Sequence, residues 1–557
     1  MAGIALHVER EWYDTSGRLI MGSQSAGESF LTALMRYGAA EDLYCYSAKQ
    51  EDFAFFVRTA TEKARGKRVC HWVSPPDVAR LAVPGCLYYP SPRLETMAWQ
   101  RRPHGSAAWS LCGVFHTTAI PGVLDGIGQL LTAPYEEWDA LICPSHSVRD
   151  LVLTVTERWA DYLAERTGGR PSLRPQLPVI PLGVDCDAFV PTPQSRAWAR
   201  EERARLGIGD DDVAVLFVGR LSFLGKAHPV PMLQGIEAAA ARTGKRLHLI
   251  LAGWFPTEEI EAAFRQAAAQ FAPSVPLHVL DGRDPVVRRN VWSAGDMFTS
   301  LVDNIQETFG LTPIEAMAAG LPVVVTDWDG YRETVRHGID GIRVPTVLAP
   351  PGAGLDIAAA HADGTINYDL YIGNVALSAA VDRTALVDAY ASLAASPELR
   401  QRMGAAGAAQ AREHYDWSAI ITRYEALWAE LAARRSAAGE RGAPAPPSPM
   451  RDDPFRLFAH YPSVALDDAH QVEIAVADWE AQIARLLDLS MMRYWRVQRL
   501  TREALLALAG RIADGGRPSV GQLCEGQAGL PRAVMLRAIL WLYKFGIVRL
   551  HPVAMDP

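Results

Sequence analysis

Short apolar runs of strand length alternate with amphipathic segments from residue 1 to about residue 187. IALHV is the first such run, and GSQSAGESFLTALMRYG predicts a Gly/Ser-rich loop that leads into an amphipathic helix. The later predicted strands, each ending in turn or polar residues, are SLCGVFHTT, DALICPS and LPVIPLGVD. This alternation predicts a doubly wound α/β sheet, in which ligands bind at the carboxyl ends of the strands.

A second alternating unit begins near Asp210 and continues to about Tyr415. Its predicted strands are DDVAVLFVGR, LHLILAG, PLHVLDG and DMFTSL, and its predicted helices are VPMLQGIEAAAAR and PTEEIEAAFRQAAAQF. Residues 345–381 interrupt this rhythm, and we expect them to form an insertion loop. The segment DWSAIITRYEALWAELAARR then predicts a strong helix that ends near Arg435.

The last part of the chain follows a segment typical of linkers, residues 436–452, which is rich in Ala, Pro, Gly and Ser. Residues 453–557 then form an appendage whose final part predicts helix, short helix, long helix and strand, as in a winged helix. In the long helix, apolar residues between Val534 and Leu542 cover most of the circumference, which indicates burial in a core or against a partner. We expect a packing or homodimerisation role rather than DNA binding.

Composition limits the classes of protein that fit. A chain of 557 residues suggests roughly two to four domains. With 49% hydrophobic and 21% charged residues it can bury sizeable cores, and its net charge of −8 argues against a dedicated nucleic-acid binder. The seven cysteines are scattered and form no CxxC pair, which favours a reducing cytoplasm without structural zinc.

The chain also lacks the usual signals for export or membrane insertion. The start, MAGIALHVEREWYD, reaches charged residues too early for a signal peptide. No apolar stretch approaches the roughly 20 residues that a membrane-spanning helix needs. We therefore expect a soluble cytoplasmic protein.

The segment ETFGLTPIEAMAAGLPVVVT carries the most chemical information. A polar loop with Glu307 leads into a short helix with Glu315, and free N–H groups at a helix N-terminus suit an anion such as a diphosphate. Two carboxylates beside that point could bind hydroxyls of a sugar or a ribose. For Glu315 an alternative is a capping box, with Thr312 as N-cap and Pro313 at N1. Glu307 precedes the helix and has no such alternative.

A basic pair follows the predicted VAVLFV strand. Gly219 and Arg220 stand at its carboxyl end, and Lys226 follows six residues later. Arg220 offers a forked set of donors and Lys226 a mobile point charge, which together suit a diphosphate. Taken alone, two basic residues in such a loop are more often solvated surface.

The order of these features resembles that of retaining GT-B glycosyltransferases of the glycogen-synthase-like and mannosyltransferase-like family. The likeness rests on strand-Gly-Arg-x5-Lys, the LAG strand and Glu-x7-Glu before GLPVVVTDWDG, and in the first half on DALICPSHSV and VIPLGVDCDAFVP. It covers residues 1–435. It implies two Rossmann-like domains facing a cleft: residues 1–187 on the acceptor side and 188–415 on the donor side. A crossover helix, 416–435, returns to the first domain.

The resemblance also implies roles for single residues. Arg220 and Lys226, after Gly219, would hold the donor diphosphate. Glu307 would bind the transferred sugar, and Glu315 the ribose. The backbone N–H groups that would meet sugar and phosphates are those of Phe309, Gly310 and Leu311.

Two residues of the first half are implied in the same way. His116, in GVFHTT, matches a position beside the anomeric centre; the alternative is a core histidine. The Gly22–Gly27 loop would bring Gly27 toward the phosphate, although the family usually has adjacent glycines where this chain has GSQSAG.

The chemistry needs neither a metal nor a cofactor, because fixed cations and helix-end N–H groups stabilise the charge that develops on a diphosphate leaving group. Two acidic pairs, Asp185/Asp187 and Asp327/Asp329, could mimic metal ligands, but each follows a predicted strand in a turn, and we interpret all four as turn and surface residues.

We expect a metal-independent retaining glycosyltransferase that uses a nucleotide-diphosphate sugar and an acceptor hydroxyl, with no protein nucleophile. One alternative is a glycan phosphorylase or synthase of the same fold. Another is a catalytically idle sugar-nucleotide sensor whose C-terminal domain carries the output. The apolar stretch INYDLYIGNVALSAAV could cap the second domain, meet a partner or touch a membrane surface.

Overall fold

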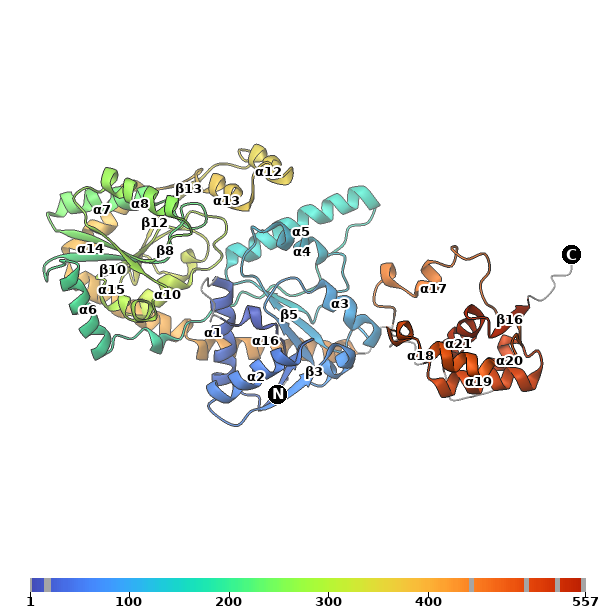
Figure 1. The fold of residues 1–557 in the computed structure, drawn as a ribbon. Helices are drawn as coiled ribbons and strands as arrows, with labels where there is room; N and C mark the ends of the chain where they lie inside the picture. Colours follow the sequence, from blue (N-terminus) through green and yellow to red (C-terminus); the bar gives the residue numbers. More distant parts are fainter. Residues whose placement is uncertain (1–2, 15–21, 440–444, 495–499, 526–530, 552–557) are drawn as a thin grey trace. The chain divides into compact units, whose positions relative to one another are not determined.

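Two six-stranded parallel sheets form the framework of the larger part of the molecule (Figure 1). The first has the order β3-β2-β1-β4-β5-β6, with β1 (Ala5–His7), β2 (Asp42–Tyr46), β3 (Val69–Val73), β4 (Cys86–Tyr89), β5 (Ser110–Val114) and β6 (Ala140–Ile142). The second has the order β12-β11-β10-β7-β8-β9, with β7 (Val213–Arg220), β8 (Leu247–Trp254), β9 (Leu277–Asp281), β10 (Met297–Ser300), β11 (Val323–Thr326) and β12 (Gly341–Val344). The expected pair of Rossmann-like domains is confirmed.

The computed structural model describes residues 3–14, 22–439, 445–494, 500–525 and 531–551. The chain divides into two compact units, Met1–Pro449 and Met450–Pro557. Both parallel sheets belong to the first unit.

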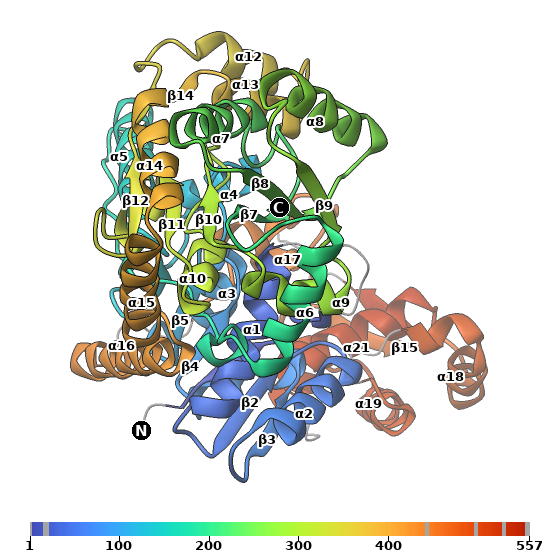
Figure 2. The same cartoon turned by 90° about the vertical axis from the view of Figure 1, so that its left-hand side faces the viewer.

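The first domain is completed by a helix from much later in the chain. Helix α16 (Trp417–Ala438) follows α14 (Arg383–Ala395) and α15 (Pro397–His414), which lead to it from the second domain (Figure 2). Trp417 and Tyr424 of α16 pack in one buried cluster with Phe30 of α1 (Gly22–Tyr37) and Tyr88 of β4. The other helices of this domain include α2 (Gln50–Lys63), α3 (Glu95–Arg101), α4 (Pro121–Gln129) and α5 (His146–Thr167).

The predicted helices of the second domain are confirmed as α7 (Pro229–Thr243) and α8 (Glu258–Phe271). Its other helices include α6 (Pro193–Arg205), α9 (Pro285–Asn290), α10 (Leu311–Ala318) and α11 (Tyr331–Thr334). The long strands β7 and β8 pair over their whole length, as their mainly apolar sequences predict.

Two elements differ from the sequence prediction. LPVIPLGVD does not form a strand: it makes only isolated bridges to β6 and to the start of α16, because Pro178 and Pro181 have no N–H to donate to a ladder. Residues 345–381 are not a loop but a small folded insertion. It consists of a ribbon of β13 (Thr346–Leu348) and β14 (Ala379–Val381) with helices α12 (Leu355–Ala362) and α13 (Tyr368–Ala376).

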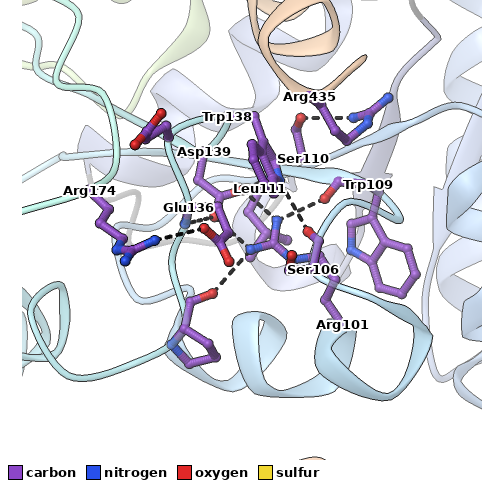
Figure 3. Close-up of polar contacts among 12 residues, drawn as sticks. Arg101, Ser106, Trp109, Ser110, Leu111, Glu136, Trp138, Asp139, Arg174 and Arg435 are labelled. Atoms are coloured by element: carbon purple, nitrogen blue, oxygen red, sulfur yellow. Dashed lines mark hydrogen bonds and ion pairs between the residues drawn. The ribbon is translucent and has the colours of Figure 1, made fainter. Parts of the chain in front are cut away.

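A buried ion pair ties α3 to the strands of the first sheet (Figure 3). The Nη1 and Nη2 atoms of Arg101 lie 2.6 Å and 2.8 Å from the two carboxylate oxygens of Asp139. Asp139 also accepts the backbone N–H groups of Leu111 and Glu136, each at 2.8 Å. Leu111 lies near the start of β5 and Asp139 just before β6, so this pair occupies the amino edge of the sheet, opposite the edge where ligands bind.

The second unit has a core of its own, in which β15 (Gln471–Ile474) pairs with β16 (Val548–His551). The predicted order of helix, short helix, long helix and strand corresponds to α19 (Arg502–Gly515), α20 (Val520–Glu525), α21 (Arg532–Lys544) and β16. Helix α21 buries Val534, Ala538 and Leu542, whereas Leu540 is 39% exposed. The long helix is therefore buried on one side and not over most of its circumference.

In the described part of the chain, no helix has the length and hydropathy to cross a membrane. All seven cysteines are unpaired thiols, and five of them are buried: Cys45, Cys86, Cys112, Cys143 and Cys186.

Candidate functional site

The candidate residues of the second domain gather where its strand order reverses. Strand β7 lies between β10 and β8, so the reversal falls between β7 and β10. Strand β7 ends at Arg220, and β10 ends at Ser300, after which residues 301–310 lead into α10. Both ends lie on the carboxyl edge of a parallel sheet, which is the usual ligand position of doubly wound folds.

The loop before α10 holds both basic residues through consecutive side chains. The Nη2 of Arg220 donates to the Oε1 of Gln306 at 3.1 Å, and the Nζ of Lys226 donates to the Oε2 of Glu307 at 3.0 Å. Arg220 and Lys226 also line one pocket together with His228. The structure thus places both cations at one pocket, each bound to a neighbouring side chain of the loop rather than surrounded only by solvent.

Glu307 is held as a carboxylate. Burial alone would raise the pKa of this group, but the Lys226 ammonium and the backbone N–H groups of Thr308 and Phe309 outweigh it, and the pKa of Glu307 lies below its usual value. The N–H of Phe309, which we expected to meet the ligand, therefore points at Glu307 in this structure. The side chain of Phe309 is buried in the core.

Helix α10 begins earlier than the capping box predicts. Its N-cap is Gly310, with no side-chain cap, so Leu311 is its first residue and Thr312 lies inside the helix. The predicted Thr312–Glu315 capping box is wrong. Gly310 has φ +85°, and a Cβ at this position would lie 1.8 Å from the ring of Tyr331. A glycine is needed here, because the tight approach to Tyr331 and the positive φ together set where the helix starts.

In the described part of the chain, Glu315 forms no contact by which its carboxylate would stabilise the fold. Its carboxylate makes no hydrogen bond or ion pair with any described residue, and desolvation raises its pKa to about 7. A ligand hydroxyl could donate a hydrogen bond to this carboxylate.

His116 lies where the two domains meet. The Oγ1 of Thr308, next to Glu307, donates to the backbone oxygen of His116 at 3.0 Å. Desolvation lowers the pKa of His116 to about 4, so the imidazole is neutral at pH 7. Its Nε2 is buried and has no partner among the described residues. The structure therefore brings His116 beside the Glu307 loop, and its free ring nitrogen is unlike that of a satisfied core histidine.

Gly27 lies in a helix and not in the loop that the sequence predicts. Residues 22–27 are already part of helix α1, and a Cβ on Gly27 would lie 2.2 Å from the backbone oxygen of Trp12. The glycine permits close packing of α1 against the backbone at Trp12. Residues 15–21, which precede the helix, lie outside the described residues.

Four acids are interpreted from the sequence as turn and surface residues, and the interpretation as a surface residue is wrong for Asp329. Asp185, Asp187 and Asp327 pair with arginines and are 37% to 62% exposed. Asp329 instead accepts the hydroxyl of Ser145 from the first domain at 2.8 Å. Burial, assisted by the nearby charges of Glu307 and Glu333, raises the pKa of Asp329 to about 7, although the Ser145 hydrogen bond opposes this. Among the described residues, no group of three or more His, Cys, Asp or Glu is placed to hold a metal ion.

Comparison with known proteins finds a family match over the segment of the chain that contains these residues. The family model described as "Glycosyl transferases group 1" matches residues 212–362, which include Arg220, Lys226, Glu307 and Glu315. Residues 212–362 belong to the glycosyl transferases group 1 family. The family resemblance expected from the sequence is confirmed for this domain.

Two curated relatives of the group 1 domain carry glycosyltransferase names. A D-inositol 3-phosphate glycosyltransferase of Geodermatophilus obscurus is 33% identical over 171 residues, which are 30% of this chain and 36% of the relative. A phosphatidyl-myo-inositol mannosyltransferase of Mycobacterium tuberculosis is 26% identical over 253 residues, 45% of this chain and 54% of the relative. The chain thus spans between 36% and 54% of the length of these two relatives.

Among solved structures, the chain is similar to Anabaena HepE in complex with UDP and glucose. The identity is 14% and the TM-score 0.48, over 77% of this chain and 100% of that chain.

Proposed function

We propose that this chain is a retaining glycosyltransferase, which moves a sugar from a nucleotide-diphosphate donor to an acceptor hydroxyl without a metal ion. The observation that carries the proposal is the pair of cations, Arg220 and Lys226, which line one pocket at the strand reversal of a domain that matches the group 1 glycosyltransferase model. Cations fixed before the reaction stabilise a developing negative charge without reorganising.

In the proposed reaction the anomeric C–O bond of the donor breaks, and its electron pair leaves with the nucleoside diphosphate. Arg220 and Lys226 bind the diphosphate, and Lys226 exchanges part of its interaction with Glu307 for the phosphate oxygens. The N-terminus of α10 contributes positive dipole to the same side. The acceptor oxygen forms the new bond to the anomeric carbon on the face from which the diphosphate departs, and its proton passes to the departing diphosphate oxygen.

Glu307 and His116 would then act on the sugar. Glu307, a carboxylate at neutral pH, accepts hydrogen bonds from sugar hydroxyls. Neutral His116 offers its unpartnered Nε2 at the domain boundary. Glu315, whose carboxylate has no partner in the protein, accepts from the ribose hydroxyls. The acceptor is a hydroxyl of a glycan, a lipid-linked glycan or a small molecule, bound mainly by the first domain.

We also propose a cytoplasmic site of action. Seven cysteines without a disulfide suit a reducing compartment. The role of the second unit is packing or homodimerisation.

The test is a thermal-shift panel of UDP-, GDP- and ADP-sugars with the full chain. A donor present at 100 times its Kd should stabilise the folded state by about 2.7 kcal/mol. One nucleotide class should shift the melting temperature, and the shift should persist in EDTA. No response to any nucleotide would count against the whole proposal, and a response lost in EDTA would count against metal independence.

A further inference from the structure

Helix α13 of the insertion lies directly on the loop that follows β7, residues 221–228, which we call the donor loop. Its residue Ile372 is fully buried, and a Cβ on Gly373 would lie 2.8 Å from Cδ2 of Leu224. Leu224 stands between Arg220 and Lys226 in the chain, and its backbone oxygen accepts from Asn304 at 2.6 Å. The insertion is therefore packed against the same loop that carries the two cations.

The first residue of α13 completes a chain of hydrogen bonds to Arg220. Arg220 donates to the Oε1 of Gln306 at 3.1 Å, and the Nε2 of Gln306 lies 3.1 Å from the hydroxyl of Tyr368. Tyr368 lies outside residues 212–362, which match the family model, whereas Arg220 and Gln306 lie within them. The contact is thus made by a part of this chain that the family match does not cover.

The direction of the Gln306 amide depends on Tyr368. A guanidinium carries only donors, so Gln306 must turn its oxygen toward Arg220, and its NH₂ group then faces away. The Tyr368 hydroxyl accepts from that NH₂ group and fixes the amide in this orientation. If the acceptor were lost, the amide could rotate and present donors to Arg220, which would release the guanidinium.

The Tyr368 hydroxyl also lies beside the first domain. Burial raises the pKa of Tyr368, and the side chains of Gln306 and Thr117 oppose this rise. Thr117 directly follows His116 in the first domain. Figure 1 shows α13 on the side of the second domain that faces the first domain. The residue therefore stands where donor loop, insertion and first domain meet.

We propose that Tyr368 is a positioning residue of the donor site, which orients Gln306 and through it holds the Arg220 guanidinium ready for the diphosphate. This inference rests on the proposed function of Arg220. An arginine side chain loses considerable freedom when it is fixed, and a network that fixes it beforehand leaves less to be ordered when the ligand binds. Gly225 supports the same arrangement, because a Cβ there would lie 2.9 Å from the Nη2 of Arg220.

The experiment compares Tyr368→Phe with the unaltered full chain, using the nucleotide sugar that gives the largest thermal shift and following its hydrolysis or transfer. Removal of one hydroxyl acceptor should lower kcat/KM by about fivefold to tenfold. In a chain that already carries Arg220→Lys, whose single ammonium cannot use the same amide geometry, Tyr368→Phe should have little further effect.

The matched control is Tyr371→Phe in the same helix. The Tyr371 ring stacks on His361, and its hydroxyl has no hydrogen-bond partner among the described residues, so activity should not change. If Tyr368→Phe left kcat/KM unchanged, or lowered it equally with Arg220→Lys present, the positioning role would be refuted while nucleotide binding still stood. An unaltered chain that binds no nucleotide sugar would instead overturn the proposed function and this inference with it.

Discussion

Lys226 and Glu307 neutralise each other 3.0 Å apart, while among the described residues Arg220 is hydrogen-bonded only to the neutral amide of Gln306. The site therefore carries a net positive charge at Arg220, whereas the charge of Lys226 is neutralised by Glu307. A diphosphate entering this site would gain a full charge interaction with Arg220 and compete with Glu307 for Lys226. Both cations should matter, for different reasons.

Arg220→Ala or Lys226→Ala should each lower the rate of sugar transfer about a hundredfold, which corresponds to about 3 kcal/mol of transition-state stabilisation. The measurement is kcat/KM with the donor found in the thermal-shift panel. Lys245→Ala, at an exposed lysine of the same domain, should keep the full rate. Rates within a few-fold of the unaltered chain in both site variants would contradict the diphosphate role.

Glu315→Gln should separate ligand binding from stability. Because the folded state raises the pKa of Glu315 to about 7, the unfolded chain ionises this group first as the pH rises. The folded state therefore loses stability between about pH 4.5 and pH 7, and the full loss remains above pH 7.

The glutamine variant lacks this loss, so its melting temperature should exceed that of the unaltered chain at pH 8 and match it near pH 4.5. Nucleotide binding should nevertheless weaken at pH 8. A lower melting temperature at pH 8, with unchanged nucleotide affinity, would assign Glu315 to the fold instead.

At the residue scale, the sequence located the acids and bases but not all of their partners. Arg220, Lys226 and Glu307 could be proposed as site residues because charged residues that follow apolar strands can be recognised in the amino-acid sequence. Gln306 and Asp329 could not, since their roles depend on contacts with Tyr368 and Ser145, which are distant in the chain. The position of Gln306 directly before Glu307 was the one available signal.

Among the elements, the start of α10 depends most on a single residue. In Gly310→Ala, the alanine would have to adopt a positive φ. Its Cβ would also collide with the ring of Tyr331, which is buried and hydrogen-bonded to Ser300. We expect a loss of about 3 kcal/mol in the free energy of unfolding, together with weaker nucleotide binding.

Gly320→Ala is the control, because Gly320 has φ +81° but no atom within 4 Å of the new Cβ. Backbone strain alone should reduce its stability by about 1 kcal/mol. Equal losses from the two variants, measured by denaturant unfolding, would show that the contact with Tyr331 does not matter.

The buried pair of α3 provides a second test at this scale. Arg101→Ala leaves Asp139 buried without its counter-ion and should lower the free energy of unfolding by about 3–5 kcal/mol. Arg170→Ala breaks a pair of similar length, 2.8 Å, whose side chains are more than half exposed. That variant should lose less than about 1 kcal/mol. A small effect of Arg101→Ala would mean that Asp139 is satisfied by its backbone donors alone.

Elements were predictable where the pattern was long and uniform. Strands β7 and β8 are apolar runs that no helix period fits, and α8 has a clear apolar face. Strands β2, β3 and β4 were not predicted, because they are four or five residues long and mix Tyr, His and Trp with apolar residues. The capping box was locally well formed, but the Gly310–Tyr331 contact starts the helix earlier.

For the whole molecule, the second unit is the part with the least assigned chemistry. Its long helix α21 buries one side in its own core and exposes Leu540 and Tyr543 on another. The chain as a whole carries a net charge of −8. We expect no retarded band in a gel-shift assay of the full chain with generic duplex DNA at low salt, with a basic DNA-binding protein as the positive control. Tight binding would reverse this assignment.

The return of α16 to the first domain has a consequence for synthesis. Phe30 and Tyr88 emerge from the ribosome early, yet their buried neighbours Trp417 and Tyr424 emerge only after the whole second domain. Helices α1 and α2 cover part of the same face of the first sheet, but until then the surface that α16 covers stays exposed. We therefore expect the nascent first domain to remain incomplete while the second domain folds, and a ribosome that stalls before residue 417 to leave a fragment with this apolar surface exposed.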